Sequence, residues 1–257
     1  MTRIELAFGP CDVDVSGSGP AVLLIHGVLV NASLWDPVAP VLAETNHVIA
    51  PNLPIGAHRV AAARRDLVHP EAVADALVAL LDALGVERAA VVGSDTGGAI
   101  AQLFAARHPD RLTGLALLSC DAFDHFPPTL LKPMRRPLAI GAFVDLLGWM
   151  YRFGPIRRSW LGAGLVLNHP IDEAVIAPWF DQIAGDREVR RDMAAFIRAC
   201  RPALTHRAAD ALRTFPHPAM VACPEAIGSF RKPMRGGWPP PCPTVSCGGS
   251  TIPARSR

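Results

Sequence analysis

The segment Gly93 to Gly98, with the sequence Gly-Ser-Asp-Thr-Gly-Gly, constrains the fold of this chain more than any other. It follows a short apolar run at 89–92 and precedes a helix-like stretch at 99–107. Small residues two positions before and two positions after a central residue allow a strand to turn sharply into a helix, and the central side chain is left exposed above the sheet. This is the frame of a nucleophile elbow, and Asp95 occupies its central position.

A carboxylate at the centre of this turn favours a particular chemistry. Attack of a carboxylate on an acyl carbon would give a labile anhydride, whereas attack on a saturated carbon that carries a halide or an epoxide oxygen gives an ordinary ester that water can cleave. The rival interpretation is that Asp95 only caps the helix that follows, as most isolated Gly-x-Asp-x-Gly sequences would. In a strand–turn–helix context we favour the nucleophile.

Length and composition favour one α/β domain with an insertion, because half of the 257 residues are hydrophobic. The N-terminus lacks the layout of a signal peptide, which predicts a cytoplasmic protein, and no apolar stretch is long enough for a membrane span. No pair of cysteines has metal-ligand spacing, so we expect neither a metal nor an organic cofactor. Residues 223–257 carry five Lys or Arg and one Glu, so residues 1–222 sum to −2 and nothing indicates nucleic acid.

Short extended runs alternate with helical ones, which predicts a mainly parallel sheet covered on both faces. The expected strands are 4–8 and 12–15 around a turn at Gly9-Pro10, then 21–25, 47–50, 89–92, 115–118 and 218–222, and the expected core helices are 34–43, 70–84 and 99–107. We divide the chain into an α/β core (1–122), a helical lid inserted after the sixth strand (123–215), a returning core strand (216–222) and an aberrant Pro/Gly-rich tail (223–257).

Three ordered motifs resemble the α/β-hydrolase superfamily. His26-Gly27 followed by Trp35 is similar to its oxyanion-loop signature, the run 51–56 is similar to its Asp-Leu-Pro-Gly loop, and the elbow followed by 105–112 is similar to its helix-to-strand run. The likeness covers about residues 3–222 and implies the α/β-hydrolase fold. Because the elbow carries Asp, the nearest branches are the haloalkane-dehalogenase-like and epoxide-hydrolase-like enzymes.

The resemblance implies a partial catalytic site. Asp95 would be the nucleophile, and the backbone N–H groups of Thr96 and Val28 would face the developing anion. The branch also needs an acid; Asp121 stands at one of the two expected places, with Asp124 as second choice, although Asp121 could merely cap the start of the lid. The supporting residues of the loop and the elbow would be His26, Gly27, Gly93, Gly97 and Gly98.

The sequence departs from both branches at the residues that handle the leaving group. Dehalogenases of this type hold the halide with a Trp after the nucleophile and often an Asn after His-Gly, and here those places are Thr96 and Val28. Epoxide hydrolases of this type use two lid tyrosines, and the chain contains only Tyr151. We therefore rank epoxide hydrolysis slightly above dehalogenation, with a small apolar molecule as substrate.

Two other functions stay open. One is a non-catalytic homologue that binds a small apolar ligand between lid and core. The other is an ester or lactone hydrolase in which Ser94 or Thr96 is the nucleophile.

The sequence lacks a histidine where this superfamily places its base. Hydrolysis of an ester on Asp95 needs a base, which should follow the last strand, but residues 223–257 contain no His, seven Pro and five Gly. Reading the degenerate codons of 224–244 in a shifted frame gives a peptide that looks like the superfamily's loop and amphipathic helix. We infer a frameshifted tail, which removes the last strand and helices and cripples the hydrolase; the alternative is a genuine disordered tail.

Overall fold

The computed structural model describes residues 1–129, 131–159, 162 and 172–222. The tail that we interpret as frameshifted, residues 223–257, lies outside the described residues, as does part of the expected lid.

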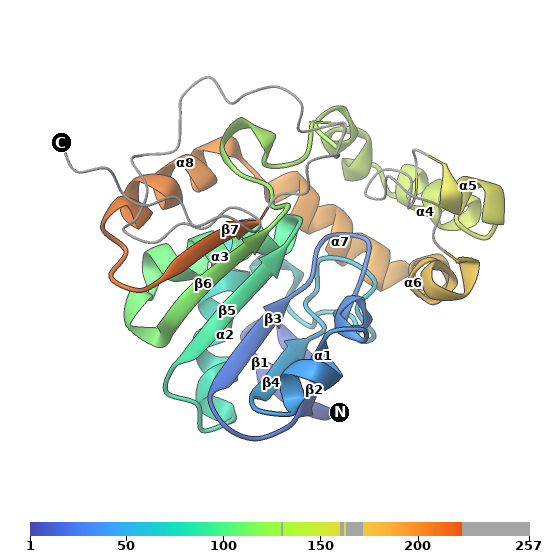
Figure 1. Ribbon diagram of the computed structural model, residues 1–257. Coiled ribbons are helices and arrows are strands. Elements are labelled where there is room, and N and C mark those ends of the chain that lie inside the picture. The colour runs from blue at the N-terminus through green and yellow to red at the C-terminus, as the bar shows by residue number, and fades with distance from the viewer. Residues whose placement is uncertain (130, 160–161, 163–171, 223–257) are drawn as a thin grey trace.

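A seven-stranded, mainly parallel sheet forms the centre of the molecule (Figure 1). The strand order is β1-β2-β4-β3-β5-β6-β7; the β1–β2 and β2–β4 pairs are antiparallel and the other neighbours are parallel. The strands are β1 (Thr2–Leu6), β2 (Gly9–Ser16), β3 (Ala21–Ile25), β4 (His47–Pro51), β5 (Ala89–Ser94), β6 (Leu112–Leu118) and β7 (Ala219–Ala222). The parallel strands bring their carboxyl ends to one edge, where open α/β sheets bind ligands.

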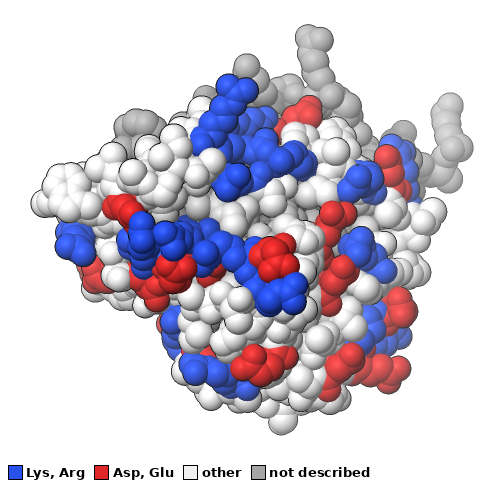
Figure 2. All heavy atoms as spheres, turned by 180° about the vertical axis from the view of Figure 1, so that it is seen from behind, with Lys and Arg blue, Asp and Glu red and all other residues white. Residues whose placement is uncertain are grey.

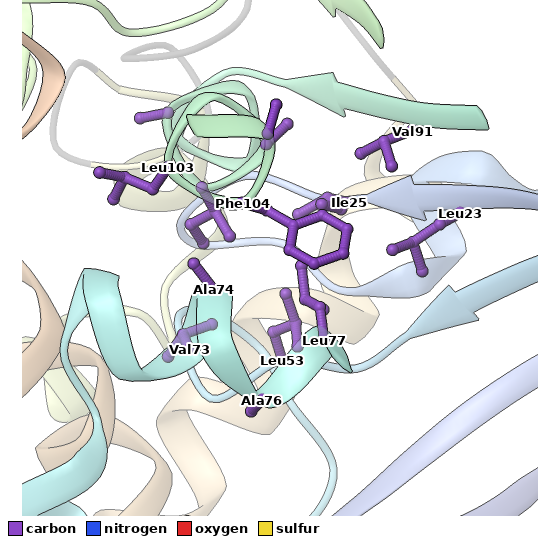
Figure 3. Close-up of a cluster of buried hydrophobic side chains, with 14 of the residues drawn as sticks. Leu23, Ile25, Leu53, Val73, Ala74, Ala76, Leu77, Val91, Leu103 and Phe104 are labelled. Atoms are coloured by element: carbon purple, nitrogen blue, oxygen red, sulfur yellow. The ribbon is translucent and has the colours of Figure 1, made fainter. Parts of the chain in front are cut away.

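Helices cover both faces of this sheet, as the alternating sequence pattern predicts. On one face lie α2 (Pro70–Ala83), α3 (Thr96–Arg107) and α8 (Pro202–Ala211), and α1 (Ala39–Ala43) packs on the other. Figure 3 shows the ring of Phe104 from α3 beside Ile25 of β3 and Leu77 of α2, all fully buried. Burial of one such large apolar side chain contributes about 1.5–3 kcal/mol to folding.

A helical segment connects β6 to β7, in agreement with the predicted insertion after the sixth strand. It contains α4 (Gly141–Met150), α5 (Gly154–Arg158), α6 (Glu173–Gly185), α7 (Arg187–Ala199) and α8. Helices α4, α5 and α6 project beyond one end of the sheet (Figure 1). A second core joins this segment to the loop after β3, because Val28 and Leu29 pack in one cluster with Trp179 of α6 and Met193 of α7.

The surface carries charges of both signs. Basic and acidic side chains are interspersed over much of the rear face (Figure 2). Many form ion pairs, such as Arg107 with Asp75 and Arg187 with Asp145, both at 2.7 Å. None of the helices in the described ranges combines the length and the hydropathy that crossing a bilayer requires.

Two local predictions were wrong. The first turn lies at Ala7-Phe8 rather than at Gly9-Pro10, because β2 already begins at Gly9 and pairs it with Leu6. The helix expected at 34–43 is a 3₁₀ turn, Ala32–Trp35, followed by the short α1. Pro37 contributes to this break, because its nitrogen carries no hydrogen to donate within a helix.

Candidate functional site

Asp95 occupies a strained one-residue turn between β5 and α3. Its backbone has φ +54° and ψ −130°, a combination that non-glycine residues rarely adopt. Helix α3 begins at the next residue, Thr96, three positions earlier than the sequence suggests. The turn presents Asp95 at the carboxyl edge of the sheet, whereas Ser94 belongs to the regular strand.

The elbow closes only because small residues surround Asp95. A Cβ atom at Gly97 would lie 2.3 Å from the carbonyl oxygen of His26, and one at Gly98 would lie 2.1 Å from the Cβ of Cys120. At Gly93 the nearest atom, the carbonyl oxygen of Gly97, would be 2.6 Å away. These three predicted elbow residues therefore lie where only glycine fits.

The loop after β3 brings a backbone donor to the Asp95 carboxylate. The N–H of Val28 donates to Oδ2 of Asp95 over 3.2 Å. Gly27 makes this approach possible, because a Cβ atom there would lie 2.3 Å from the same Oδ2. Val28 therefore lies at one of the two positions expected to face a developing anion, and the N–H of Thr96 also interacts with the Asp95 carboxylate.

His26 braces this loop from below the carboxylate. Its Nε2 accepts the N–H of Leu53 over 3.0 Å, and therefore Nδ1 carries the proton and donates to the Gly27 carbonyl oxygen over 2.8 Å. Complete burial lowers the pKa of His26 to about 4. A neutral ring with both nitrogens engaged has no free nitrogen with which to take a proton from water.

Asp121 lies directly beside the elbow. It is 3% exposed, and its Oδ2 accepts the hydroxyl proton of Thr96 over 2.7 Å. Gln102 of α3 fixes the same turn, because its side-chain N–H donates to the Asp121 carbonyl oxygen over 2.9 Å. Asp124, the second choice for the acid, instead lies at the surface, where it is 81% exposed and pairs with His206 at 3.1 Å.

Both carboxyl groups, that of half-buried Asp95 and that of buried Asp121, have raised pKa values. Burial raises the pKa of Asp95 to about 6, against the opposing effect of hydrogen bonds from Thr96 and Val28. Burial and the charge of Asp95 together hold the pKa of Asp121 well above its usual range. Asp95 thus ionises first, and Asp121 keeps its proton beside it.

No histidine ring in the described ranges hydrogen-bonds to the Asp95 or Asp121 carboxyl group. Other histidine rings have partners away from this site, among them His58 with Asp192, His108 with Asp75 and His206 with Asp124. The Val28 N–H therefore orients the Asp95 carboxylate without a contact from any histidine of the described ranges.

Tyr151, the one tyrosine of the chain, is buried in the helical segment. Its ring packs edge-on against Phe180 with 4.9 Å between centroids, and burial raises its pKa to about 12. Both residues belong to the cluster that also holds Val28. The helical segment therefore places a mostly apolar cluster against the loop that carries Val28.

The sequence did not point to several polar residues that hold the loop after β3. Asn31 donates from its side-chain nitrogen to the Ala57 carbonyl oxygen over 3.0 Å, and Oδ1 of Asn52 accepts the N–H of Ala32 over 3.3 Å. His58 and Asp192 form a further contact, which connects the core to α7. Asn52 could have been found, because it follows a buried strand directly; no motif marks the other three.

Comparison with known proteins agrees with this architecture. Residues 20–140 match the family described as alpha/beta hydrolase fold. The chain is 38% identical over 114 residues to a fluoroacetate dehalogenase from a Burkholderia species, covering 40% of this chain and 35% of the relative. It is 36% identical over 167 residues to a haloalkane dehalogenase from Mesorhizobium japonicum, covering 65% of this chain and 49% of the relative.

A solved structure shows the same fold. The haloalkane dehalogenase from Bradyrhizobium elkani superposes with a TM-score of 0.69 at 21% identity, covering 86% of this chain and 79% of that chain. The alignments span between 30% and 50% of the length of the curated relatives. The sheet order, the family match over residues 20–140 and the structural likeness lead to one conclusion: this chain has the α/β-hydrolase fold.

Proposed function

We propose that Asp95 is a nucleophile that forms an alkyl ester with a small apolar electrophile. The hydrogen bond of 3.2 Å from Val28 N–H to Asp95 Oδ2 carries this proposal, because it holds one carboxylate oxygen and leaves the other to attack. A bond forms between that second oxygen and a saturated carbon of the substrate. The bond from this carbon to the epoxide oxygen or halide breaks at the same time, and the leaving group takes the electron pair.

The leaving group divides the two candidate reactions. The names of two relatives, a fluoroacetate dehalogenase and a haloalkane dehalogenase, favour a carbon–halogen bond. Against this, the hydroxyl of Thr96 already donates to Asp121 and the side chain of Val28 is aliphatic, so neither side chain offers an N–H group to a halide. We therefore keep epoxides slightly ahead of alkyl halides as substrates.

The second half of the reaction needs a base. We propose that this chain stops at the ester, because the sequence carries no histidine after His217 and the described histidines do not contact either carboxyl group. We propose residues 123–215 as the lid over the Asp95 carboxylate and residues 1–122 and 216–222 as the core. The frameshift and the cytoplasmic location stay predictions.

Covalent trapping tests this function. The purified chain is incubated with a terminal aryl epoxide and, separately, with a primary bromoalkane, and adducts are located by peptide mass spectrometry. We expect one adduct per chain, on Asp95, and none in the Asp95→Asn variant. An adduct on Ser94 or Thr96 would instead support an ester hydrolase, and no adduct would support a ligand-binding protein. Sustained turnover would contradict the proposal that this chain stops at the ester.

A further inference from the structure

His58 is a buried histidine that bridges the core and the helical segment. It lies in the loop after β4 and is 1% exposed. Its Nδ1 lies 3.0 Å from the carbonyl oxygen of Gly56, and its Nε2 lies 3.2 Å from Oδ2 of Asp192 on α7. The two residues are 134 positions apart in the sequence.

Asp192 is an ionised partner. It is fully buried, yet its Oδ2 accepts the N–H of Ala62 over 2.7 Å and its Oδ1 accepts Nε–H of Arg65 over 2.6 Å. Burial alone would favour the neutral acid, but the hydrogen bonds from His58, Ala62 and Arg65 together lower the pKa of Asp192. A carboxylate with donors on both oxygens has no reason to hold a proton.

Both ring nitrogens of His58 therefore face acceptors. A carbonyl oxygen and an ionised carboxylate can only accept, whereas a neutral imidazole has one N–H to give. The imidazolium form satisfies both contacts, and a buried cation beside a buried anion avoids the cost of an unpaired charge.

The charged groups around His58 agree with this assignment. Arg65 lies beyond Asp192 and also binds Glu188 of α7 at 2.7 Å, and Glu188 in turn binds Arg191 at 2.8 Å. On the core side stands His26, whose pKa is lowered first by burial and further by the charge of His58.

The carbonyl that His58 binds belongs to the support of the oxyanion loop. A Cβ atom at Gly56 would lie 2.3 Å from the carbonyl oxygen of Val30, and the N–H of Ala57 donates to that same oxygen over 2.9 Å. Leu29 has φ +67°, a strained conformation that persists only where neighbours hold it. The residue before it, Val28, holds Asp95.

We propose that doubly protonated His58 is a positioning residue that, together with Asp192, ties α7 to the loop carrying the Val28 donor of Asp95. The expected effect on the alkylation of Asp95 rests on the proposed function. The protonation of His58 and its anchoring of the loop do not. Misplacement of a reacting group by a fraction of an ångström to one ångström costs up to about a hundredfold in rate.

The first test needs no activity. In the wild-type chain at about pH 7, a ¹⁵N–¹H correlation spectrum is expected to show two ring protons on His58. Amide hydrogen exchange of Ala57 reports whether the loop is held. A His58 ring with a single proton at this pH overturns the proposal, even if every variant fails to fold.

The variant Asp192→Asn tests the anchoring, with Glu188→Gln as its matched control on the same helix. We expect Asp192→Asn to speed Ala57 exchange and slow Asp95 alkylation, each about tenfold. Glu188→Gln leaves the His58–Asp192 contact in place and is expected to change each by less than about twofold.

The outcomes separate the two proposals. A folded Asp192→Asn variant with wild-type exchange and wild-type alkylation overturns the positioning role. Absence of any Asp95 adduct in wild type defeats the proposed function alone, because the ring protons and the amide exchange of Ala57 still decide the protonation and anchoring of His58.

Discussion

The backbone N–H of Asp121 donates a hydrogen bond to the carbonyl oxygen of Asp95 over 3.1 Å. The bond fixes two carboxyl residues at the ends of neighbouring strands, and the Thr96 hydroxyl adds a second link to Asp121. Two adjacent carboxyl groups, one buried and one half-buried, resist double ionisation. The pair therefore carries one negative charge near neutral pH, and that charge lies on Asp95.

The alkylation of Asp95 should depend on pH. Only the ionised carboxylate attacks, and the pKa of Asp95 is raised to about 6. Below that pH the rate is expected to rise about tenfold per pH unit, and it levels off above it. Adduct formation, followed by mass spectrometry between about pH 4.5 and about pH 8, measures this; circular dichroism at each pH confirms that the fold is intact. A rate that stays flat through pH 6 would contradict the raised pKa.

Asp95→Asn should stabilise the protein at neutral pH. The folded state holds the Asp95 proton more tightly than the unfolded state, so the stability linked to this group is complete below the unfolded pKa of about 4 and is lost as pH rises through about 6. The amide carries no charge to bury, and we expect a gain of about 1–3 kcal/mol at pH 8 that shrinks towards pH 4. Urea unfolding of both proteins at the two pH values measures it. Equal stabilities at pH 8 would argue against a buried charge.

Gly27→Ala should remove reactivity at Asp95. The new methyl group would lie 2.3 Å from Oδ2, so either the loop or the carboxylate must move. We expect the alkylation rate to fall by about a hundredfold or more. Gly185→Ala is the control, because no atom lies within 4 Å of its added Cβ. Comparable rates for the two variants would show that the close approach of Gly27 to Asp95 has no role.

Asp121→Asn should leave the first alkylation nearly unchanged. Asp121 keeps its proton beside ionised Asp95, and an amide of the same size can still accept the Thr96 hydroxyl. We expect a rate within about threefold of wild type in a single-turnover assay. A much larger loss would assign Asp121 a direct part in the attack.

The sequence predicts the regions with strong local signals. The strand Ala21–Ile25 has the expected bounds, and the helix opened by Pro70 ends one residue earlier than expected, because apolar periodicity and proline placement are local properties. The position of Asp95 at a strand–helix turn follows from its small neighbours in the same way. Asp121 was placed near it only through the family resemblance.

Other features depend on tertiary structure. His58 and Asp192 meet across 134 residues, and neither stands in a pattern that distinguishes it from a surface side chain. Their pairing follows from how α7 docks on the loop after β4, which no local propensity encodes. The turn predicted at Gly9-Pro10 was misplaced for a similar reason. The observed turn lies two residues earlier and contains Phe8, which is buried by tertiary packing.

The last backbone hydrogen bond between the ends of β6 and β7 fixes where the chain leaves the sheet. Ser119 donates its N–H to the carbonyl oxygen of Ala222 over 2.9 Å, two residues before Asp121. The backbone at Ala222 therefore lies at the carboxyl edge of the sheet, close to Asp121. A segment grafted after Ala222 would therefore begin its path next to Ser119, two residues before Asp121.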